Sequence, residues 1–185
     1  MRKVFFIVST LFLFACGSNE GEIKIDEANS ENNPIDTFEE RESEIQKYTT
    51  LLFEDSLKFN QDYAEKLLIA YEDFIKHHSF EIVSLDYQFK AGELAKALNK
   101  PHIAIKHFND LIDRKPDHEK APMALFYKAM IVGDMLQEHE TAKQFYQEFI
   151  DKYPDHPFVE SAKASIELQG KDLNDIVKEF EQKNS

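Results

Sequence analysis

Apolar residues recur along most of this chain at the three- and four-residue spacing of an α-helix. The clearest stripe lies in residues 64–75 and consists of Ala64, Leu67, Leu68, Ala70, Tyr71, Phe74 and Ile75. We find no convincing alternation of apolar and polar residues of the kind that indicates a half-buried strand. The pattern therefore predicts an all-α fold, with helices over residues 42–57, 61–77, 82–98, 102–114, 121–136, 140–152, 157–168 and 173–182.

Helix-breaking residues fall at the ends of these segments. Pro101 stands at the start of one predicted helix, a position that tolerates proline because its missing N–H has no intrahelical partner there. Pro116 and Pro154 follow two other segments, and Gly170 with Asp172 marks a cap and a restart before the last one. These residues support the predicted boundaries.

Two stretches of the chain are similar at an offset of 38 residues, the distance from Lys90 to Lys128. The aligned pairs are Ala91/Ala129, Leu98/Leu136, Ala104/Ala142, Phe108/Tyr146, Ile112/Ile150 and Pro116/Pro154, and both copies continue Pro-Asp-His. A fixed period of about 20 to 50 residues marks stacked supersecondary units that cannot bury their apolar faces alone. Such arrays usually bind other proteins, and few of them are enzymes.

The repeat resembles the tetratricopeptide repeat, a pair of antiparallel helices that pack closely through small residues. The matching positions are a small residue late in the first helix (Ala91, Ala129), alanine early in the second (Ala104, Ala142), an aromatic four residues later (Phe108, Tyr146) and a final proline (Pro116, Pro154). The chain departs from the family in its longer period, where the family has about 34 residues, and in the bulky Leu111 and Phe149 at a third small position. The resemblance implies a tetratricopeptide-like helix-pair solenoid of about four pairs in residues 41–185.

The N-terminal residues read as a lipoprotein signal peptide over residues 1–15. Arg2 and Lys3 precede an apolar run that is too short to span a bilayer, which needs about 20 residues. The run ends in Leu-Phe-Ala-Cys-Gly, which resembles the lipobox of bacterial lipoproteins and implies that Cys16 becomes the lipid-modified first residue of the mature chain. Gly17 stands where an inner-membrane retention signal would place Asp, so the resemblance favours the outer membrane. The alternative is an ordinary signal peptide with a chance cysteine at its end.

Composition separates a tether from the repeat domain and excludes nucleic acid as a partner. Residues 16–40 are rich in Gly, Ser, Asn and acidic side chains and poor in apolar ones, so we expect a disordered acidic tether. The formal net charge of −13 leaves no basic cluster to replace the counterions of a nucleic acid. The same charge argues against the folded domain lying on an anionic membrane surface. We expect no cofactor apart from the covalent lipid on Cys16.

The resemblance also implies where a partner would bind. Ligand-facing positions of the family's first helices map onto a candidate partner groove that includes Gln88, Lys96, Met123, Phe126, Met130 and Asp134. Methionine repacks around varied shapes, so such a groove could hold an apolar peptide or helix. The competing interpretation is that residues 121–136, which are apolar nearly all round, form a helix buried in the core.

Catalytic and metal-binding motifs are lacking. His77 and His78 are adjacent, and His102 and His107 are five residues apart, so neither pair has the spacing of a known metal-ligand motif. No nucleophile elbow, phosphate-binding loop or cysteine nucleophile occurs, and the carboxylates are spread along the helices. We therefore expect neither a catalytic site nor a metal site, and we expect the protein not to be an enzyme.

The repeats, the helix endings and the lipobox together resemble the small tetratricopeptide lipoproteins of Gram-negative envelopes. These are related to the BamD-type component of the machine that assembles β-barrels in the outer membrane. The resemblance implies a lipid-anchored scaffold on the periplasmic face of the outer membrane, whose partners are envelope proteins or peptides such as β-barrel assembly subunits. Two alternatives stay open: a periplasmic coordinator of cell-wall or division machinery, and a surface-exposed lipoprotein that binds or hydrolyses a solute.

Overall fold

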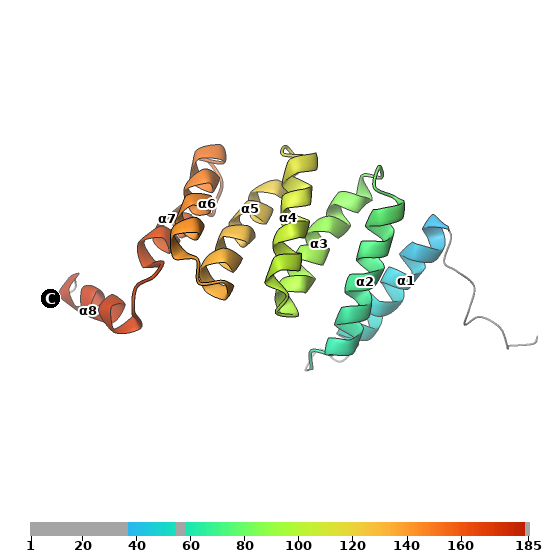
Figure 1. Ribbon diagram of the computed structural model, residues 1–185, viewed down its shortest axis with the longest axis horizontal. Helices are drawn as coiled ribbons and strands as arrows, with labels where there is room; N and C mark the ends of the chain where they lie inside the picture. The colour runs from blue at the N-terminus through green and yellow to red at the C-terminus, as the bar shows by residue number, and fades with distance from the viewer. Residues whose placement is uncertain (1–36, 55–57, 184–185) are drawn as a thin grey trace, which may run out of the picture. The chain divides into compact units, whose positions relative to one another are not determined.

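A computed structural model of the chain describes residues 37–54 and 58–183, all within the unit Ile35–Ser185. The described secondary structure is helical throughout, which confirms the predicted all-α class (Figure 1). The elements are α1 (Phe38–Phe53), α2 (Gln61–His77), α3 (Val83–Ala97), α4 (Pro101–Arg114), α5 (Ala121–Met130), η1 (Ile131–Met135), α6 (His139–Lys152), α7 (Val159–Leu168) and α8 (Leu173–Lys183). The predicted signal peptide, the predicted lipidation site Cys16 and nearly all of the predicted tether lie outside the described residues.

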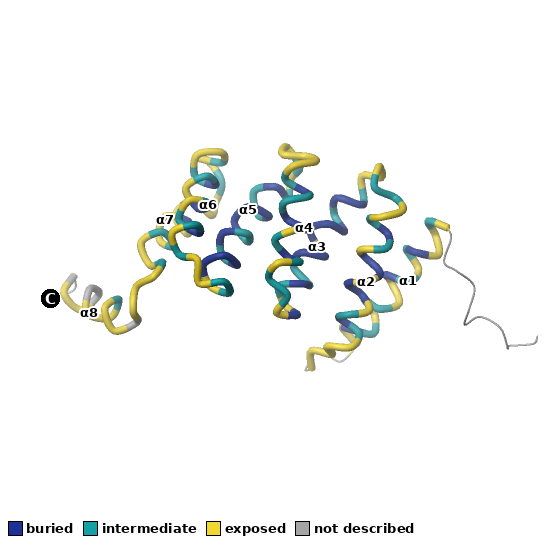
Figure 2. The backbone as a smooth tube through the Cα atoms, viewed as in Figure 1, coloured by how far each residue is buried: buried dark blue, intermediate teal, exposed yellow. Residues whose placement is uncertain are grey.

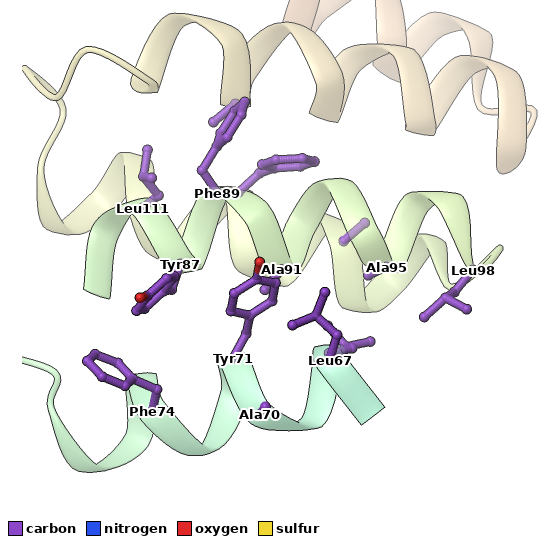
Figure 3. Close-up of a cluster of buried hydrophobic side chains, with 14 of the residues drawn as sticks. Leu67, Ala70, Tyr71, Phe74, Tyr87, Phe89, Ala91, Ala95, Leu98 and Leu111 are labelled. Atoms are coloured by element: carbon purple, nitrogen blue, oxygen red, sulfur yellow. The ribbon is translucent and has the colours of Figure 1, made fainter. Parts of the chain in front are cut away.

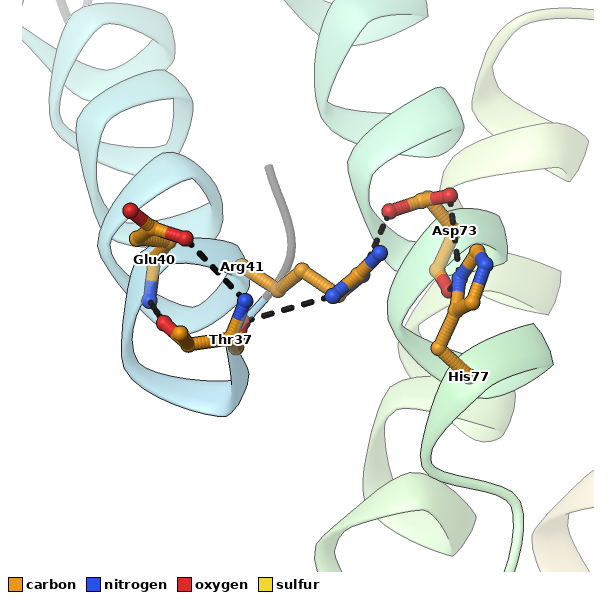
Figure 4. A network of polar contacts seen from close by, with 5 residues as sticks. All are labelled: Thr37, Glu40, Arg41, Asp73 and His77. Atoms are coloured by element: carbon orange, nitrogen blue, oxygen red, sulfur yellow. Dashed lines mark hydrogen bonds and ion pairs between the residues drawn. The ribbon is translucent and has the colours of Figure 1, made fainter. Parts of the chain in front are cut away.

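Helix α1 begins inside the segment predicted as tether, four residues before the predicted start at 42. Thr37 caps it: its side chain accepts a hydrogen bond from the Glu40 backbone N–H at 3.1 Å, and the Thr37 N–H donates to the Glu40 carboxylate at 3.0 Å. This reciprocal capping box satisfies two N–H groups that the first turn of a helix otherwise leaves unpaired. In the next turn, Arg41 Nε donates to Asp73 Oδ2 of α2 at 2.8 Å (Figure 4). This hydrogen bond holds the polar N-terminal end of α1 against α2.

Each α-helix from α1 to α6 packs on the α-helix that follows it, and the most extensive contact joins α3 to α4. The alanines that the repeat aligned lie at these contacts: Ala91, Ala104, Ala129 and Ala142 are fully buried. A methyl group in place of a longer side chain lets two helix backbones approach closely, which explains why alanine recurs at these positions. Figure 2 shows buried positions on the sides of α2 to α6 that face neighbouring helices.

Aromatic and aliphatic side chains fill the space between the helices. Tyr71 and Phe74 of α2 point toward Tyr87 of α3, with ring centroids 5.3 Å apart for Tyr71–Tyr87 and 4.8 Å for Phe74–Tyr87 (Figure 3). Phe89, two residues beyond Tyr87, lies on the opposite side of α3 and stacks on Tyr127 of α5 at 5.9 Å. Helix α3 thus contributes core residues on two faces, as a helix between two neighbours must.

The segment predicted as one helix over residues 121–136 is two elements. Helix α5 ends at Met130 and continues as the π-helix η1 over Ile131–Met135. In η1 the Leu136 N–H donates to the Ile131 carbonyl oxygen at 3.1 Å, five residues back rather than four. No helix in the described ranges is both long enough and apolar enough to cross a membrane.

Candidate functional site

A hollow of about 600 Å³ lies between η1, the beginning of α6 and the end of α7, and we call it the η1–α7 hollow. Its apolar lining comes from Phe126 and Met130 of α5 and from Leu168 of α7. Its polar lining consists of Asp134, Gln137, His139, Tyr146, Ser165, Gln169, Lys171 and Asp172. A concave site that combines apolar side chains with convergent polar groups has the general character of a binding site.

The π-helix shapes one wall of this hollow. Beyond the Leu136 bond, the Glu138 N–H reaches back to the Val132 carbonyl oxygen at 2.9 Å, and Gln137 takes a positive φ of 60°. The Gln137 side-chain amide donates to the Asp134 carbonyl oxygen at 2.7 Å and holds the turn. A π-helical turn carries an extra residue, which changes the direction of the side chains within it. Here it leaves Asp134 exposed on the rim, directly after the buried Gly133.

Gln169 joins the walls of the hollow. Its Oε1 lies 3.0 Å from His139 Nδ1, and because a carbonyl oxygen can only accept, this imidazole nitrogen is the donor. Its Nε2 donates to Asp134 Oδ1 over a longer 3.4 Å. Gly133 makes this approach possible, since a Cβ on that residue would lie 2.5 Å from the Gln169 Oε1. One amide at the end of α7 therefore connects to η1 and to the start of α6, which lie about 30 residues earlier in the sequence.

Tyr146 is a deeply buried residue of the lining and contributes a hydroxyl group to it. The Tyr146 side chain is 2% exposed. Burial raises the pKa of its hydroxyl, and a hydrogen bond with Ser165 acts in the opposite direction. With its pKa above the ordinary value of 10.0, the phenol stays neutral at physiological pH and serves as a hydrogen-bonding group.

The rim carries more negative than positive side chains. Asp134 and Asp172 line the hollow, and Glu138 lines an adjoining depression that shares His139 and Gln169 with it. Lys171 lines the hollow as well, and Lys143 at the depression is paired with Glu140 at 2.7 Å. Among the described residues, none of Asp134, Glu138 and Asp172 forms an ion pair with Lys or Arg.

The structure brings three of the six predicted groove residues together and separates the other three from them. Phe126, Met130 and Asp134 line the η1–α7 hollow. Phe126 also belongs to the core, because it is 8% exposed and its ring packs edge-on against Tyr146 and Phe149 at centroid distances of 5.4 and 5.5 Å. Residues 121–136 are therefore core on most sides and line a hollow on one, and the binding of a partner there stays a prediction.

Gln88, Lys96 and Met123 lie elsewhere. Gln88 was predicted on the groove but is 1% exposed, because α3 is covered at this point by α4, and its Nε2 lies 2.9 Å from His107 Nδ1. Lys96 places its ammonium 4.4 Å from the centre of the Tyr127 ring, a cation–π contact. Met123 is partly buried and packs against the two clusters of buried hydrophobic residues that form the core. These three residues contribute to packing in the structure.

Sequence reasoning missed most of the polar lining. His139 and Tyr146 lie two turns apart on α6, Gln169 follows α7, and no local motif links the three residues. The sequence does carry two relevant signals, namely Gly133 beside Asp134 and Gly170 after Gln169. Gly170 has a positive φ of 79°, which ends α7 beside the hollow.

A second hollow, of about 480 Å³, lies between α1, α2 and α3. Its lining is mainly apolar and includes Leu52, Phe53, Phe59 and Leu94, with Lys90 and Glu93 as the charged members. Burial raises the pKa of the Glu93 carboxyl, while Lys96, Lys120 and Lys90 act to lower it. Sequence reasoning named none of these residues as a site.

Within residues 37–54 and 58–183, no three His, Cys, Asp or Glu side chains gather as a set of metal ligands. Two of the histidines contact carboxylates instead. His77 Nδ1 lies 3.2 Å from Asp73, and the buried His107 Nε2 lies 3.2 Å from Glu72. These contacts join neighbouring turns or neighbouring helices.

A known family model matches a segment of the chain that lines this site. Residues 123–156 match the family model described as the tetratricopeptide repeat. A comparison with curated proteins finds no match for this chain. The matched segment covers most of α5, all of η1 and α6, and the Pro-Asp-His turn, which is the second copy of the repeat found in the sequence. The chain thus carries a tetratricopeptide repeat, and that repeat supplies Phe126, Met130, Asp134, His139 and Tyr146 to the η1–α7 hollow.

Proposed function

We propose that this protein is a non-catalytic scaffold, anchored in the outer membrane by lipid on Cys16, that holds a segment of another envelope protein in the η1–α7 hollow. The observation that carries the proposal is the hollow itself, since it is built largely from the matched repeat. Stacked helical repeats create extended surfaces that typically bind protein segments. A lining that combines apolar side chains with hydrogen-bonding groups suits a peptide, whose side chains need burial and whose backbone needs hydrogen-bond partners.

The anchor is tested by Cys16→Ser in the full-length chain. Each acyl CH₂ that enters the membrane contributes about 0.8 kcal/mol, so two or three acyl chains hold a protein firmly and their loss releases it. We expect the native protein in the membrane fraction and the variant either uncleaved or in the aqueous fraction. If the mature Cys16→Ser protein stays in washed membranes, the lipid anchor is not what holds it there.

The binding surface is tested by photo-cross-linking in the native cells. A benzoylphenylalanine residue replaces Met130 or Leu168, which line the hollow, or Gln147, which is exposed on α6 outside it. We expect Met130 and Leu168 to cross-link the same envelope protein and Gln147 not to do so. Equal products from all three positions, or products from Gln147 alone, would show that the hollow is not the binding surface.

The identity of the cross-linked protein separates the roles that the resemblance suggests. We favour an accessory of BamD type, for which β-barrel assembly subunits or barrel precursors are the expected products and depletion lowers the abundance of barrel proteins. Cell-wall or division proteins, together with localisation at midcell, would instead make the protein a coordinator.

Binding of a small solute is a second candidate function, which the size of the hollow and its convergent polar groups favour. Ligand sites for small molecules typically have volumes of about 300 to 1,000 Å³, and the η1–α7 hollow has about 600 Å³. A solute-binding protein on the cell surface would be digested by protease added to intact cells, and it would give no specific protein product from Met130.

A further inference from the structure

The η1–α7 hollow combines exposed carboxylates at its rim with the apolar side chains of Phe126, Met130 and Leu168, and this combination restricts the chemistry of its occupant. We infer that the hollow selects a basic protein segment in which a Lys or Arg side chain stands beside an apolar one. This inference rests on the proposed function, because it names the kind of segment that the same hollow holds.

The apolar lining residues provide a place for the apolar side chain of the partner. Phe126 is held by rings on several sides, including Tyr146 at 5.4 Å and Phe158 at 5.3 Å between centroids, so it forms a fixed wall. Met130 is partly buried and unbranched, so it can adjust to differently shaped side chains. Leu168 stays 43% exposed at the edge of the hollow and has apolar surface left to bury. An aliphatic or aromatic residue of the partner would cover this surface.

The rim provides the charge. Asp134 on η1 and Asp172 after α7 lie among the lining residues, and in the described part of the chain neither forms an ion pair with a Lys or Arg. Asp134 Oδ1 accepts a long 3.4 Å bond from Gln169, and Asp172 Oδ1 accepts a 2.8 Å bond from the Asn174 N–H. Lys171 is the basic residue of the lining, and Glu138 adds a further negative charge in the adjoining depression.

Basic side chains fit such a site for two reasons. The long methylene stems of Lys and Arg can lie along apolar surface while the charged group reaches a carboxylate at the edge. Hydrogen bonds between a cation and a carboxylate are also shorter and about twice as strong as those between neutral groups. An acidic segment would instead bring like charges together at the rim, which opposes binding.

The test is a peptide selection with the full-length lipidated chain in detergent micelles. A display library of random nonapeptides is selected against the native protein, against Asp134→Asn/Asp172→Asn, and against Asp113→Asn/Asp155→Asn. The last variant removes the same two charges from exposed positions outside the hollow. Thermal melting of each protein, followed by circular dichroism, verifies that the variants remain folded.

We expect the native protein and the control variant to enrich peptides with Arg or Lys next to Leu, Ile, Met or Phe. The best synthetic peptide should bind Asp134→Asn/Asp172→Asn about tenfold more weakly, and its affinity for the native protein should fall as salt is raised. Enrichment without basic residues, equal binding to all three proteins, or the absence of any selected peptide would overturn the inference.

The outcomes also separate this inference from the proposed function. A specific envelope protein cross-linked through Met130 by a segment without basic residues would leave the scaffold function standing and remove the basic selectivity. Selection of basic peptides in vitro, together with no cross-linked protein in cells, would remove the scaffold function and leave only a peptide-selective hollow.

Discussion

Gly92 and Gly133 are both buried, but the side chains that press against them differ in mobility. A Cβ on Gly92 would lie 2.6 Å from Phe108 Cε1, part of a ring that is fully buried between α3 and α4. A Cβ on Gly133 would meet the free end of the Gln169 side chain, which can rotate away. A Cβ would therefore be equally crowded at either glycine, but only at Gly133 can the neighbouring side chain move away.

We predict that Gly92→Ala destabilises the protein by about 1–3 kcal/mol relative to Gly133→Ala, because overpacking a rigid core has a cost of that size. Replacing glycine with alanine in a helix gains about 1 kcal/mol in helix propensity at either position. The difference in stability between the two variants therefore measures the cost of the contact between the new Cβ and Phe108. Urea denaturation of the two variants measures it, and equal stabilities would show that the Phe108 ring moves freely. Gly133→Ala should also weaken peptide binding, because it displaces Gln169 from Asp134 and His139.

His107 is a buried titratable residue that faces groups from three helices. Gln88 of α3 donates to its Nδ1 at 2.9 Å, and its Nε2 lies 3.2 Å from Glu72 of α2. Lys106 and Asp110 of its own helix also act on it electrostatically. Burial lowers the pKa of His107 below 6.5, although Glu72 and Asp110 act to raise it. The Gln88 amide enforces the neutral form, since a proton on Nδ1 would face an N–H donor.

This pKa shift has a defined consequence for stability. Because the folded-state pKa of His107 lies below the unfolded value, the unfolded chain binds the proton first as pH falls through about 6.5. Stability should therefore be complete above that pH and decline below it. Urea titrations from about pH 8 down to about pH 5 should show a steeper decline for the native protein than for His107→Gln. Parallel curves would mean that protonation of His107 does not oppose folding.

At the scale of the helices, the alanines of the repeat set how closely neighbours approach. Ala142 is fully buried in the core cluster that α6 shares with α5 and α7. We predict that Ala142→Glu destabilises the protein by several kcal/mol, because it buries an unpaired charge at a helix–helix contact. Gln144→Glu, an acidic change at an exposed position of the same helix, should alter the melting temperature little. Unchanged thermal unfolding of Ala142→Glu would contradict the alignment of the repeat.

Over the whole described domain, two core clusters share their boundary residues. Ile105, Ile112, Met123 and Tyr127 pack against both clusters, so the helices from α1 to α7 are joined through contacts between neighbours. Helix α8 is absent from the pairs of helices that make extensive contact. The last helix thus has less tertiary support than α3 or α4.

We predict that amide hydrogens of α8 exchange with solvent well before those of α3 and α4. Helices of this length are marginal without tertiary packing, so local opening of α8 requires little free energy. Hydrogen exchange measured by mass spectrometry on the full-length protein tests this expectation. Protection of α8 equal to that of α4 would indicate that α8 docks on another surface.

The sequence by itself determined the all-α class, the positions of most helices and the repeat. These properties depend on residues close together in the chain: the helical spacing of apolar side chains, Pro101, Pro116 and Pro154 at helix ends, and alanines at contacts that recur with a fixed period. The start of α1 was missed because the composition of residues 16–40 concealed the capping box at Thr37 and Glu40, which needs only two side chains.

Only the tertiary structure decided which predicted groove residues share a surface. Gln88 and Met130 both occupy ligand-facing positions of the family, but the contact of α3 with α4 buries Gln88, whereas Met130 opens onto a hollow. The π-helix depends on a change of hydrogen-bond partner by one residue, which leaves the apolar spacing of residues 121–136 nearly unchanged. Asp134, His139 and Gln169 meet because three helical elements pack together, and the periodicity of one helix carries no information about which side chains of another will face it.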